Sequence, residues 1–338
     1  MLPLISEREP AAPLPAPQRP LTQQGVRRTF MPGSESLYAK LYTGNATADR
    51  VLTQVLERTP CRALADGWFF GRFDDPYHHL RLRFRGDPAP LSEQLWPALR
   101  DACAPLLVDG LLSRVVFDTY ERETECYGGP QAIEIAEQIF QADSEATIEL
   151  VAMLEPGAAG DRERWLFAAC GAQMLLRDLG LDAGQRLALL TQLRDSYGRE
   201  HRADAKLGRA IGERLRDERA TLAALLDPET QGDGTGLQAG AHVLLRRSER
   251  LAPLVADLDA LEARDLLPVS RPKLAASYVH MPYFRLLRMA HRRQELVIYD
   301  FLLQHARSQA ARARGRPGNP RPVAEKDHIF AVDGRATL

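Results

Sequence analysis

One short run of alternating residues limits the possible folds more than any other part of this sequence. From His79 to Arg85, leucine or phenylalanine alternates with histidine or arginine. Because successive side chains of a strand point to opposite faces, this pattern predicts a β-strand with one buried face and one basic face. Its three arginines, Arg81, Arg83 and Arg85, would lie roughly 7 Å apart along that face. Such a face can bind carboxylates, carbonyl oxygens or a peptide backbone, or it can be a solvated face with salt bridges.

The order of the other predicted elements sets the fold class. WFFGRF (Trp68–Phe73) and SRVVFDTY (Ser113–Tyr120) predict two more strands, and the segment 91–107 between them has helical spacing. Helices are predicted over 161–180, 183–199, 203–226 and 238–262, with a final helix from Ser277 or His291 to Arg314. Strands first and helices later predict an α+β fold, with an antiparallel sheet in the N-terminal half packed with a mostly helical C-terminal half.

Composition limits the domain organisation and the partners. Residues 1–26 are rich in Pro and Ala and residues 315–338 mix Pro, Gly and charge, so a single folded unit is expected over 27–314. With 44 Lys+Arg against 45 Asp+Glu, the net charge of −1 argues against a nucleic-acid partner. No apolar stretch is long enough for a membrane helix, and no signal peptide is present, so the expected location is the cytoplasm.

Several local features carry further expectations. Asp143 or Ser144 can cap a following helix, and Glu229–Gly236 is an evident loop. The four cysteines are far apart and have no histidine at metal-ligand spacing, so neither a zinc site nor a disulfide framework is expected. No Walker loop, dinucleotide fingerprint, HExxH or GxSxG motif occurs.

A second group of chemically capable residues follows the third predicted strand. FDTYERETECYGGP places Asp118, Tyr120 and Arg122 close together, and the paired glycines 128–129 allow a tight turn. The alternative is a charged strand end followed by a turn.

A third group of polar residues falls within nine positions near the C-terminus: Ser277, His280, Tyr283 and Arg285. In a helix, positions 277, 280 and 284 would share a face, but Pro282 predicts a break because it removes one donor and crowds the preceding turn. A broken helix that displays Ser, His and Tyr side chains suits acid/base chemistry. The alternative is a histidine with a structural role only.

Five motifs along the chain carry a resemblance: Trp68-Phe69-Phe70 with Arg72 and Asp74, HLRLRF, DTYERE followed by YGG, AE.IF..DS from Ala136 to Ser144, and SYVHM. Together they resemble the lantibiotic-dehydratase C-terminal, or thiopeptide-type bacteriocin biosynthesis, domain family. The resemblance extends from about Leu37 to Gln304 and implies the fold of the dehydratase elimination domain. Because no large glutamylation domain precedes the motifs, the chain is similar to the stand-alone members of thiopeptide pathways.

The resemblance implies one of two reactions on a leader-bearing precursor peptide. One kind of stand-alone member eliminates glutamate from glutamylated Ser or Thr in a tRNA-Glu-dependent pathway. The other, the pyridine synthase, joins two dehydroalanines of an azole-containing peptide by a formal 4+2 aza-cycloaddition. It then expels water and the leader peptide, which leaves a pyridine-centred macrocycle.

Two departures from the eliminase pattern favour the pyridine synthase. Phe284 stands where eliminases usually carry Asn, and Cys126 stands where they usually carry an arginine directly before YGG. Loss of an arginine weakens a site for a glutamyl carboxylate. Ser277 and Tyr283 also look like the serine and tyrosine of the pyridine-synthase branch.

The resemblance assigns roles to named residues. Tyr283, helped by Ser277, is expected to hold or protonate an amide oxygen, and His280 is the expected acid or base because histidine side chains ordinarily change charge near neutral pH. The expected substrate-binding residues are Arg81, Arg83, Asp118, Tyr120, Arg122 and Arg285. No metal, nucleotide or redox cofactor is required, and the expected partners are the precursor peptide and other enzymes of the thiopeptide pathway.

Two alternatives stay open. In a glutamate eliminase, Arg81 or Arg83 would hold the glutamyl group and His280 would move the α-proton. In a non-catalytic member, the chain would bind the leader peptide and act as a scaffold for a partner dehydratase. The presence of Ser277, His280 and Tyr283 argues against the scaffold.

Overall fold

The N-terminal half of the chain forms an antiparallel sheet. The computed structural model describes residues 26–202, 205–226, 236–288 and 291–315. Four strands pair in the order β3-β4-β2-β5: β2 (Ser36–Tyr42), β3 (Gly67–Asp74), β4 (His78–Arg85) and β5 (Arg114–Phe117). A two-stranded ribbon joins β1 (Thr29–Phe30) to β6 (Tyr120–Glu121), so the third predicted strand ends at Phe117 and Tyr120 belongs to the ribbon. The expected α+β fold is confirmed.

The alternation in β4 separates the two faces of the sheet as predicted. Its apolar side chains, Leu80, Leu82 and Phe84, are buried in a core shared with α1 (Ala48–Arg58) and α4 (Trp96–Val108). Three short helices complete this side: α2 (Cys61–Leu64), α3 (Pro88–Pro90) and η1 (Leu91–Leu95). The arginines of β4 therefore project from the opposite face of the sheet.

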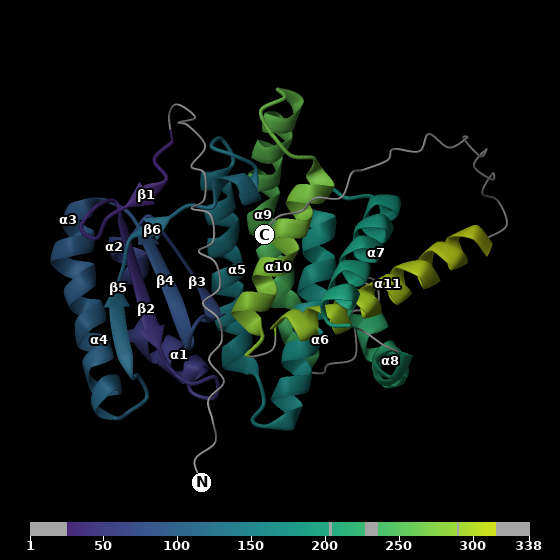
Figure 1. Ribbon diagram of the computed structural model, residues 1–338, viewed down its shortest axis with the longest axis horizontal. Coiled ribbons are helices and arrows are strands. Elements are labelled where there is room, and N and C mark those ends of the chain that lie inside the picture. The colour runs from purple at the N-terminus through teal and green to yellow at the C-terminus, as the bar shows by residue number, and fades with distance from the viewer. Residues whose placement is uncertain (1–25, 203–204, 227–235, 289–290, 316–338) are drawn as a thin grey trace, which may run out of the picture.

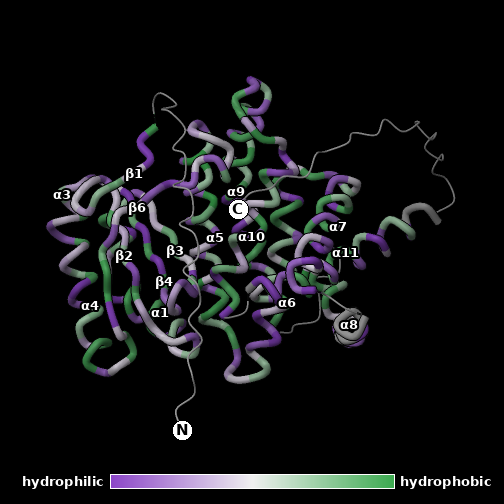
Figure 2. Tube along the Cα trace, viewed as in Figure 1, coloured by the Kyte–Doolittle hydropathy of each residue, from purple (hydrophilic) through white to green (hydrophobic). Residues whose placement is uncertain are grey.

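The second half is helical. After the short η2 (Thr124–Tyr127) come α5 (Ile133–Met153), α6 (Ala158–Asp178), α7 (Ala183–Glu200), α8 (Ala205–Leu226), α9 (Gly236–Ala263), α10 (Arg271–Leu286) and α11 (His291–Gly315). Figure 1 shows α5 between the sheet and the other helices. Hydrophobic and hydrophilic stretches alternate along these helices (Figure 2), and none of the described helices is long and apolar enough to cross a membrane.

Side chains from two helices bind the backbone of β3 and join the two halves. The N–H of Phe70 donates to Oγ of Ser144 at 3.2 Å, and the carbonyl of Phe70 accepts from Nε of Arg285 at 2.9 Å. Arg285 also donates to Asp143 at 3.0 Å. Because β3 is an edge strand, these bonds satisfy polar groups that the sheet leaves unpaired. The expected capping role of Asp143 or Ser144 is wrong, since both lie inside α5.

One further expectation is contradicted by the structure, and three others fall largely outside the described residues. The predicted break at Pro282 is wrong, because α10 continues through this residue. Many residues of α10 are buried against neighbouring helices, and this packing offsets the hydrogen bond that proline removes. The expected lead-in, C-terminal tail and Glu229–Gly236 loop fall largely on residues 1–25, 316–338 and 227–235, which lie outside the described residues.

Candidate active site

A cavity of about 150 Å³ lies where the arginine face of the sheet meets α5 and α10. Much of its wall is aromatic, and apart from two tyrosines its polar side chains are one histidine, one arginine and two glutamates. The lining residues are Phe69, Phe73, Arg83, Tyr120, Glu121, Glu123, Tyr127, Ile133, Phe140, His280, Met281 and Phe284. An apolar cavity with a few convergent polar groups is the usual form of a site for an organic substrate.

His280 is held by a carboxylate that the sequence analysis did not identify. Its Nδ1 lies 2.8 Å from Oε2 of Glu295, which is fully buried on α11. Because an ionised carboxylate can only accept, Nδ1 carries the proton and Nε2 is the nitrogen free to exchange one with a substrate. The hydroxyls of Tyr197 and Tyr299 donate to the same Glu295 oxygen at 2.7 and 3.0 Å. Phe284 packs edge-on against the imidazole, with 4.3 Å between ring centroids.

Arg83 supplies the guanidinium of the cavity. Its Cζ lies 4.8 Å from the ring centroid of Tyr38, 5.1 Å from that of Tyr120 and 5.3 Å from that of Phe69. Among the residues that the structure describes, Arg83 forms no ion pair with a carboxylate. The rings hold the guanidinium in place through cation–π attraction and leave its N–H groups available to a substrate oxygen.

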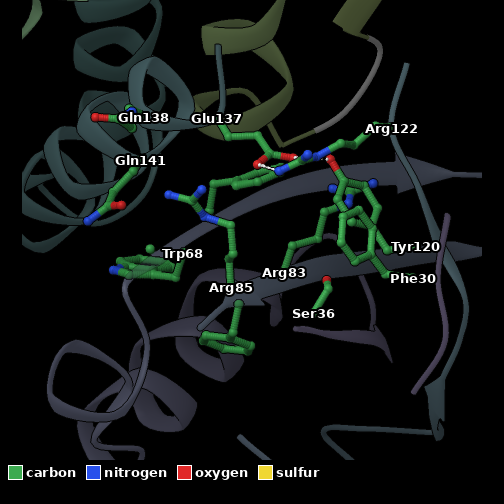
Figure 3. A pocket seen from close by; sticks show the side chains of 13 residues that line it. Phe30, Ser36, Trp68, Arg83, Arg85, Tyr120, Arg122, Glu137, Gln138 and Gln141 are labelled. Carbon is green, nitrogen blue, oxygen red and sulfur yellow. Dashed lines mark hydrogen bonds and ion pairs between the residues drawn. The ribbon is translucent and has the colours of Figure 1, made fainter. Parts of the chain in front are cut away.

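A smaller pocket, of about 20 Å³, also has Arg83 in its wall. It shares Phe69, Arg83 and Tyr120 with the cavity and adds Arg85 and two glutamines of α5. Figure 3 shows Arg83 and Arg85 rising from the same face of β4. A carbonyl oxygen or a water molecule is the size of group that this pocket can hold.

Arg81 lies beside the cavity rather than in its wall. Its Cζ is 3.7 Å from the ring centroid of Phe73, and its Nε donates to Nε2 of His79 at 2.9 Å. Nδ1 of His79 lies 2.8 Å from the carbonyl oxygen of Tyr77, so the His79 proton is on Nδ1 and Nε2 is the acceptor. Burial lowers the pKa of His79 and that of Arg81. The neutral histidine thus fixes the position of the arginine.

Tyr120 and Arg122 are tied to a buried carboxylate. Arg122 forms two bonds with Glu137, from Nε at 2.8 Å and from Nη2 at 2.7 Å, and the Tyr120 hydroxyl donates to Glu137 at 2.9 Å (Figure 3). Burial and the Glu137 charge raise the pKa of the Tyr120 hydroxyl. Arg122 therefore supports the wall that Tyr120 forms, and its own guanidinium is engaged.

Two other expected substrate-binding residues are also engaged by the protein. Asp118 lies outside the cavity and pairs with Nζ of Lys40 at 2.5 Å, which lowers the pKa of this carboxyl. Arg285 is fully buried, and its guanidinium donates to the carbonyl of Phe70 and to the carboxylate of Asp143. The geometry gives Asp118, Arg122 and Arg285 structural contacts, and of the expected set it brings Arg83 and Tyr120 together with His280.

Tyr283 and Ser277 are not placed as expected for groups that touch a substrate. The Tyr283 side chain is fully buried, packs edge-on against Tyr299 and lies beside Glu295, and burial raises its pKa well above the usual value. Ser277 is half-buried one helical turn before His280, outside the cavity wall. In this arrangement Tyr283 can act only through its neighbours.

The family can be named from these motifs and this fold. The family described as lantibiotic biosynthesis dehydratase, C-terminal, matches residues 37–306, which is most of the chain. The chain belongs to this family. The match includes the arginine strand, the Tyr120–Tyr127 segment and the α10 motif that together form the cavity.

Individual relatives cover different shares of this family member. The subtilin biosynthesis protein SpaB of Bacillus subtilis is 33% identical over 162 residues, which is 45% of this chain and 15% of SpaB. The crystal structure of the tRNA-dependent lantibiotic dehydratase MibB from Microbispora sp. 107891 matches with a TM-score of 0.61 and 21% identity, over 85% of this chain and 29% of MibB. The pyridine synthase TbtD from thiomuracin biosynthesis matches with a TM-score of 0.57 and 14% identity, over 81% of this chain and 98% of TbtD. At these identities the two structures show a shared fold.

The residues that sequence reasoning missed lie mostly on α7 and α11. Glu295 and Tyr197 are 98 positions apart, so no local motif joins them. A signal for Glu295 is nevertheless present, because it shares a helix face with Ile298, Tyr299 and Leu302, all buried and apolar or aromatic. A carboxylate on the apolar stripe of a helix marks a position that needs buried hydrogen-bond donors.

Proposed function

We propose that this member of the lantibiotic dehydratase C-terminal family is a pyridine synthase. Its substrate would be a leader-bearing, azole-containing peptide with two dehydroalanines. The observation that carries the proposal is the place of Phe284, which lies in the cavity wall against His280 and Phe73, at centroid distances of 4.3 and 5.6 Å. An apolar ring at this position suits uncharged dehydroalanines and azole rings better than a glutamyl ester.

The His280–Glu295 pair and Arg83 can supply the proton transfers of this reaction. Nε2 of His280 would take the amide N–H proton of one dehydroalanine and return it to the amide oxygen, which Arg83 hydrogen-bonds, and this tautomerisation gives the imidic acid with a C=N–C=C unit. The second alkene would then add across this 2-azadiene and close a hydroxylated six-membered ring. Loss of water, and loss of the leader peptide as an amide, would leave the aromatic pyridine. In each of the two losses, Nε2 of His280 would take a proton from the ring and give it to the leaving group.

The aromatic wall would contribute mainly by bringing the two alkenes together. Phe69, Phe73, Phe140 and Phe284 offer flat apolar surfaces on which an azole-containing peptide can fold. Holding two reacting groups of one chain in contact can contribute up to ~7–11 kcal/mol to the rate. Tyr283 packs against Tyr299, which donates to Glu295, so Tyr283 would influence His280 through this packing without contact with the substrate.

A second candidate function is supported by the arginines. Among the described residues, neither Arg81 nor Arg83 forms an ion pair with a carboxylate; Arg83 lines the cavity and Arg81 lies beside it. Two such guanidinium groups could hold the carboxylates of a glutamyl group while His280 removes the α-proton. This would make the protein a glutamate-eliminating subunit of a dehydratase.

Mass spectrometry of two reactions tests the proposal. Purified protein is incubated with a leader-linked, azole-containing peptide that bears two dehydroalanines, and separately with a leader-linked peptide glutamylated on serine. Release of the leader as an amide, with a core lighter by the leader and one water, is expected from the first substrate. Loss of glutamate from the second substrate alone would reject the pyridine synthase in favour of the eliminase. Binding of the leader without a mass change in either substrate would favour the non-catalytic scaffold over both enzymes.

A further inference from the structure

A third pocket, which shares no lining residue with the His280 cavity, has an unusual concentration of positive charge. It measures about 560 Å³ and lies between the segment before α1, helix α6 and the segment that follows α10. Its polar lining residues include Asn45, Asp161, Arg162, Arg164 and Arg288. These parts of the chain come from both halves of the molecule.

Three guanidinium groups share one carboxylate beside this pocket. Asp49 accepts from Arg72 at 2.5 Å, from Arg164 at 2.6 Å and from Arg288 at 3.1 Å. Arg72 and Arg164 are almost completely buried, whereas Arg288 is 37% exposed and borders the pocket. The three arginines lower the pKa of Asp49, although its burial acts in the opposite sense. One negative charge therefore faces three positive charges in a poorly hydrated place.

The other acidic groups at the pocket do not balance this excess. Asp161 is well exposed and reaches Arg288 only at 3.4 Å, where solvent screens the pair. Glu218 is engaged by Arg162, with bonds of 2.7 and 2.6 Å. The pKa of Arg164 falls to about 10 because of its burial and the nearby charges of Arg72 and Arg288. An added anion would relieve this repulsion.

Two buried polar atoms at the pocket have no hydrogen-bond partner among the described residues. They are Nε of Arg164, a donor on a side chain that is 4% exposed, and Oδ1 of Asn45, an acceptor. An acidic residue within a peptide carries both complements, since its carboxylate accepts and its backbone N–H donates. Phosphate or a free dicarboxylate lacks the backbone N–H that a peptide residue carries beside its carboxylate.

We infer that this pocket binds an acidic side chain of the peptide substrate, with the carboxylate on Arg288 and Arg164 and a peptide N–H on Asn45. The inference rests on the proposed function only in taking the ligand to be a peptide. His280 lies on α10 and Arg288 follows the end of this helix by two residues, so α10 connects the two sites.

An NMR titration of the arginine side chains tests this inference. The probe is N-acetyl-glutamate N-methylamide, which carries the carboxylate and both flanking amides of a peptide residue. The ¹⁵N–¹H signals of Arg164 and Arg288 Nε should shift and saturate, and the glutamine analogue should bind at least tenfold more weakly. No saturable shift, or equal binding of the glutamine analogue, would overturn the inference. Inorganic phosphate with the same affinity as the glutamate probe would also overturn it, because the site would then be a general anion site.

Variants separate this pocket from the rest of the molecule. Arg288→Gln should weaken the glutamate probe at least tenfold, as should Asn45→Asp, which adds a repelling carboxylate. Arg246→Gln is the matched control, because Arg246 is also a half-exposed arginine in an ion pair but lies on α9 with Glu149. Unchanged affinity in both pocket variants would refute the assignment. These readouts involve no turnover, so a failed pyridine-synthase assay and a failed binding test remain distinguishable.

Discussion

Glu295 lies fully buried on α11 and accepts a hydrogen bond from Nδ1 of His280 across 2.8 Å. This contact fixes the tautomer and the orientation of the imidazole that faces the cavity. Tyr197 and Tyr299 donate to the same carboxylate oxygen, so the charge is stabilised without contact with solvent. The proposed acid/base role of His280 therefore depends on a fully buried residue, Glu295.

Removal of either member of this pair should reduce catalysis to different extents. His280→Ala should lower kcat at least ~100-fold, the usual contribution of a general acid or base. Glu295→Gln should lower kcat roughly tenfold, because an amide can still accept from Nδ1 but cannot stabilise the imidazolium charge. Single-turnover mass spectrometry gives both rates. His242→Ala, an exposed histidine on α9, should behave as the unchanged protein, and full activity of His280→Ala would remove His280 from the mechanism.

Tyr283→Phe separates direct from indirect action of this tyrosine. Because its side chain is fully buried, we expect kcat to fall by less than about tenfold while KM and Tm stay close to those of the unchanged protein. A loss as large as that of His280→Ala, at an unchanged Tm, would show that Tyr283 reaches the substrate as the sequence resemblance implies.

Substrate binding should depend on Arg83 more than on any other residue of the arginine strand. Arg83→Gln should raise KM at least tenfold, because the substrate oxygen loses a charged donor. Arg83→Lys should restore little, since an ammonium lacks the planar fork that stacks on Tyr38 and Tyr120. The kinetic constants of both variants are compared with those of Arg100→Gln, an exposed arginine of α4. A KM within twofold of the control would exclude Arg83 from binding.

Local periodicity was sufficient to predict the parts of the fold that depend on one buried face. The strand 78–85 follows from strict alternation, and the helices 183–200 and 205–226 lie within one or two residues of their predicted bounds. Tertiary contacts decided the rest. The sequence predicts that Ser144 can cap a helix, but it lies in the middle of α5. Its hydroxyl accepts a hydrogen bond from the N–H of Phe70 in the edge strand β3. Pro282 reads as a break, but packing around α10 keeps the helix continuous.

The candidate site was predictable only in part, for a related reason. Arg83, Tyr120 and His280 come from motifs that a single sequence displays, and the fold brings them to one cavity. The sequence does not reveal which polar residues the protein itself engages. In the sequence, nothing distinguishes Arg122 and Arg285 from Arg83. In the structure, however, their guanidinium groups bind buried carboxylates that lie 15 and 142 positions away in the chain. Pairings over such distances in sequence are set by the tertiary fold.

The bridge between β3 and the helices should be important for stability. Arg285→Met leaves the Phe70 carbonyl and part of Asp143 without donors, and we expect a loss of about 3 kcal/mol in the free energy of unfolding. Ser144→Ala should cost about 1–2 kcal/mol, because the buried N–H of Phe70 loses its acceptor. Urea denaturation followed by circular dichroism measures both. Ser196→Ala, an exposed serine of α7, should stay within about 0.5 kcal/mol of the unchanged protein, and equal stability of all three variants would contradict the bridging role.

His79 should make the stability of the protein depend on pH in a defined direction. Burial lowers the pKa of His79, and the charges of Arg81, Lys40 and His78 lower it further. The hydrogen bond to the Tyr77 carbonyl acts in the opposite direction. Below the ordinary histidine pKa of about 6.5, the unfolded chain therefore binds a proton that folded His79 resists. The free energy of unfolding should fall as the pH decreases from about 7.5 to 5.5, and the fall should be smaller in His79→Gln, whose amide oxygen can still accept from Arg81. Urea denaturation of both proteins at several pH values gives the two slopes, and parallel slopes would mean that His79 is protonated as easily in the folded as in the unfolded chain.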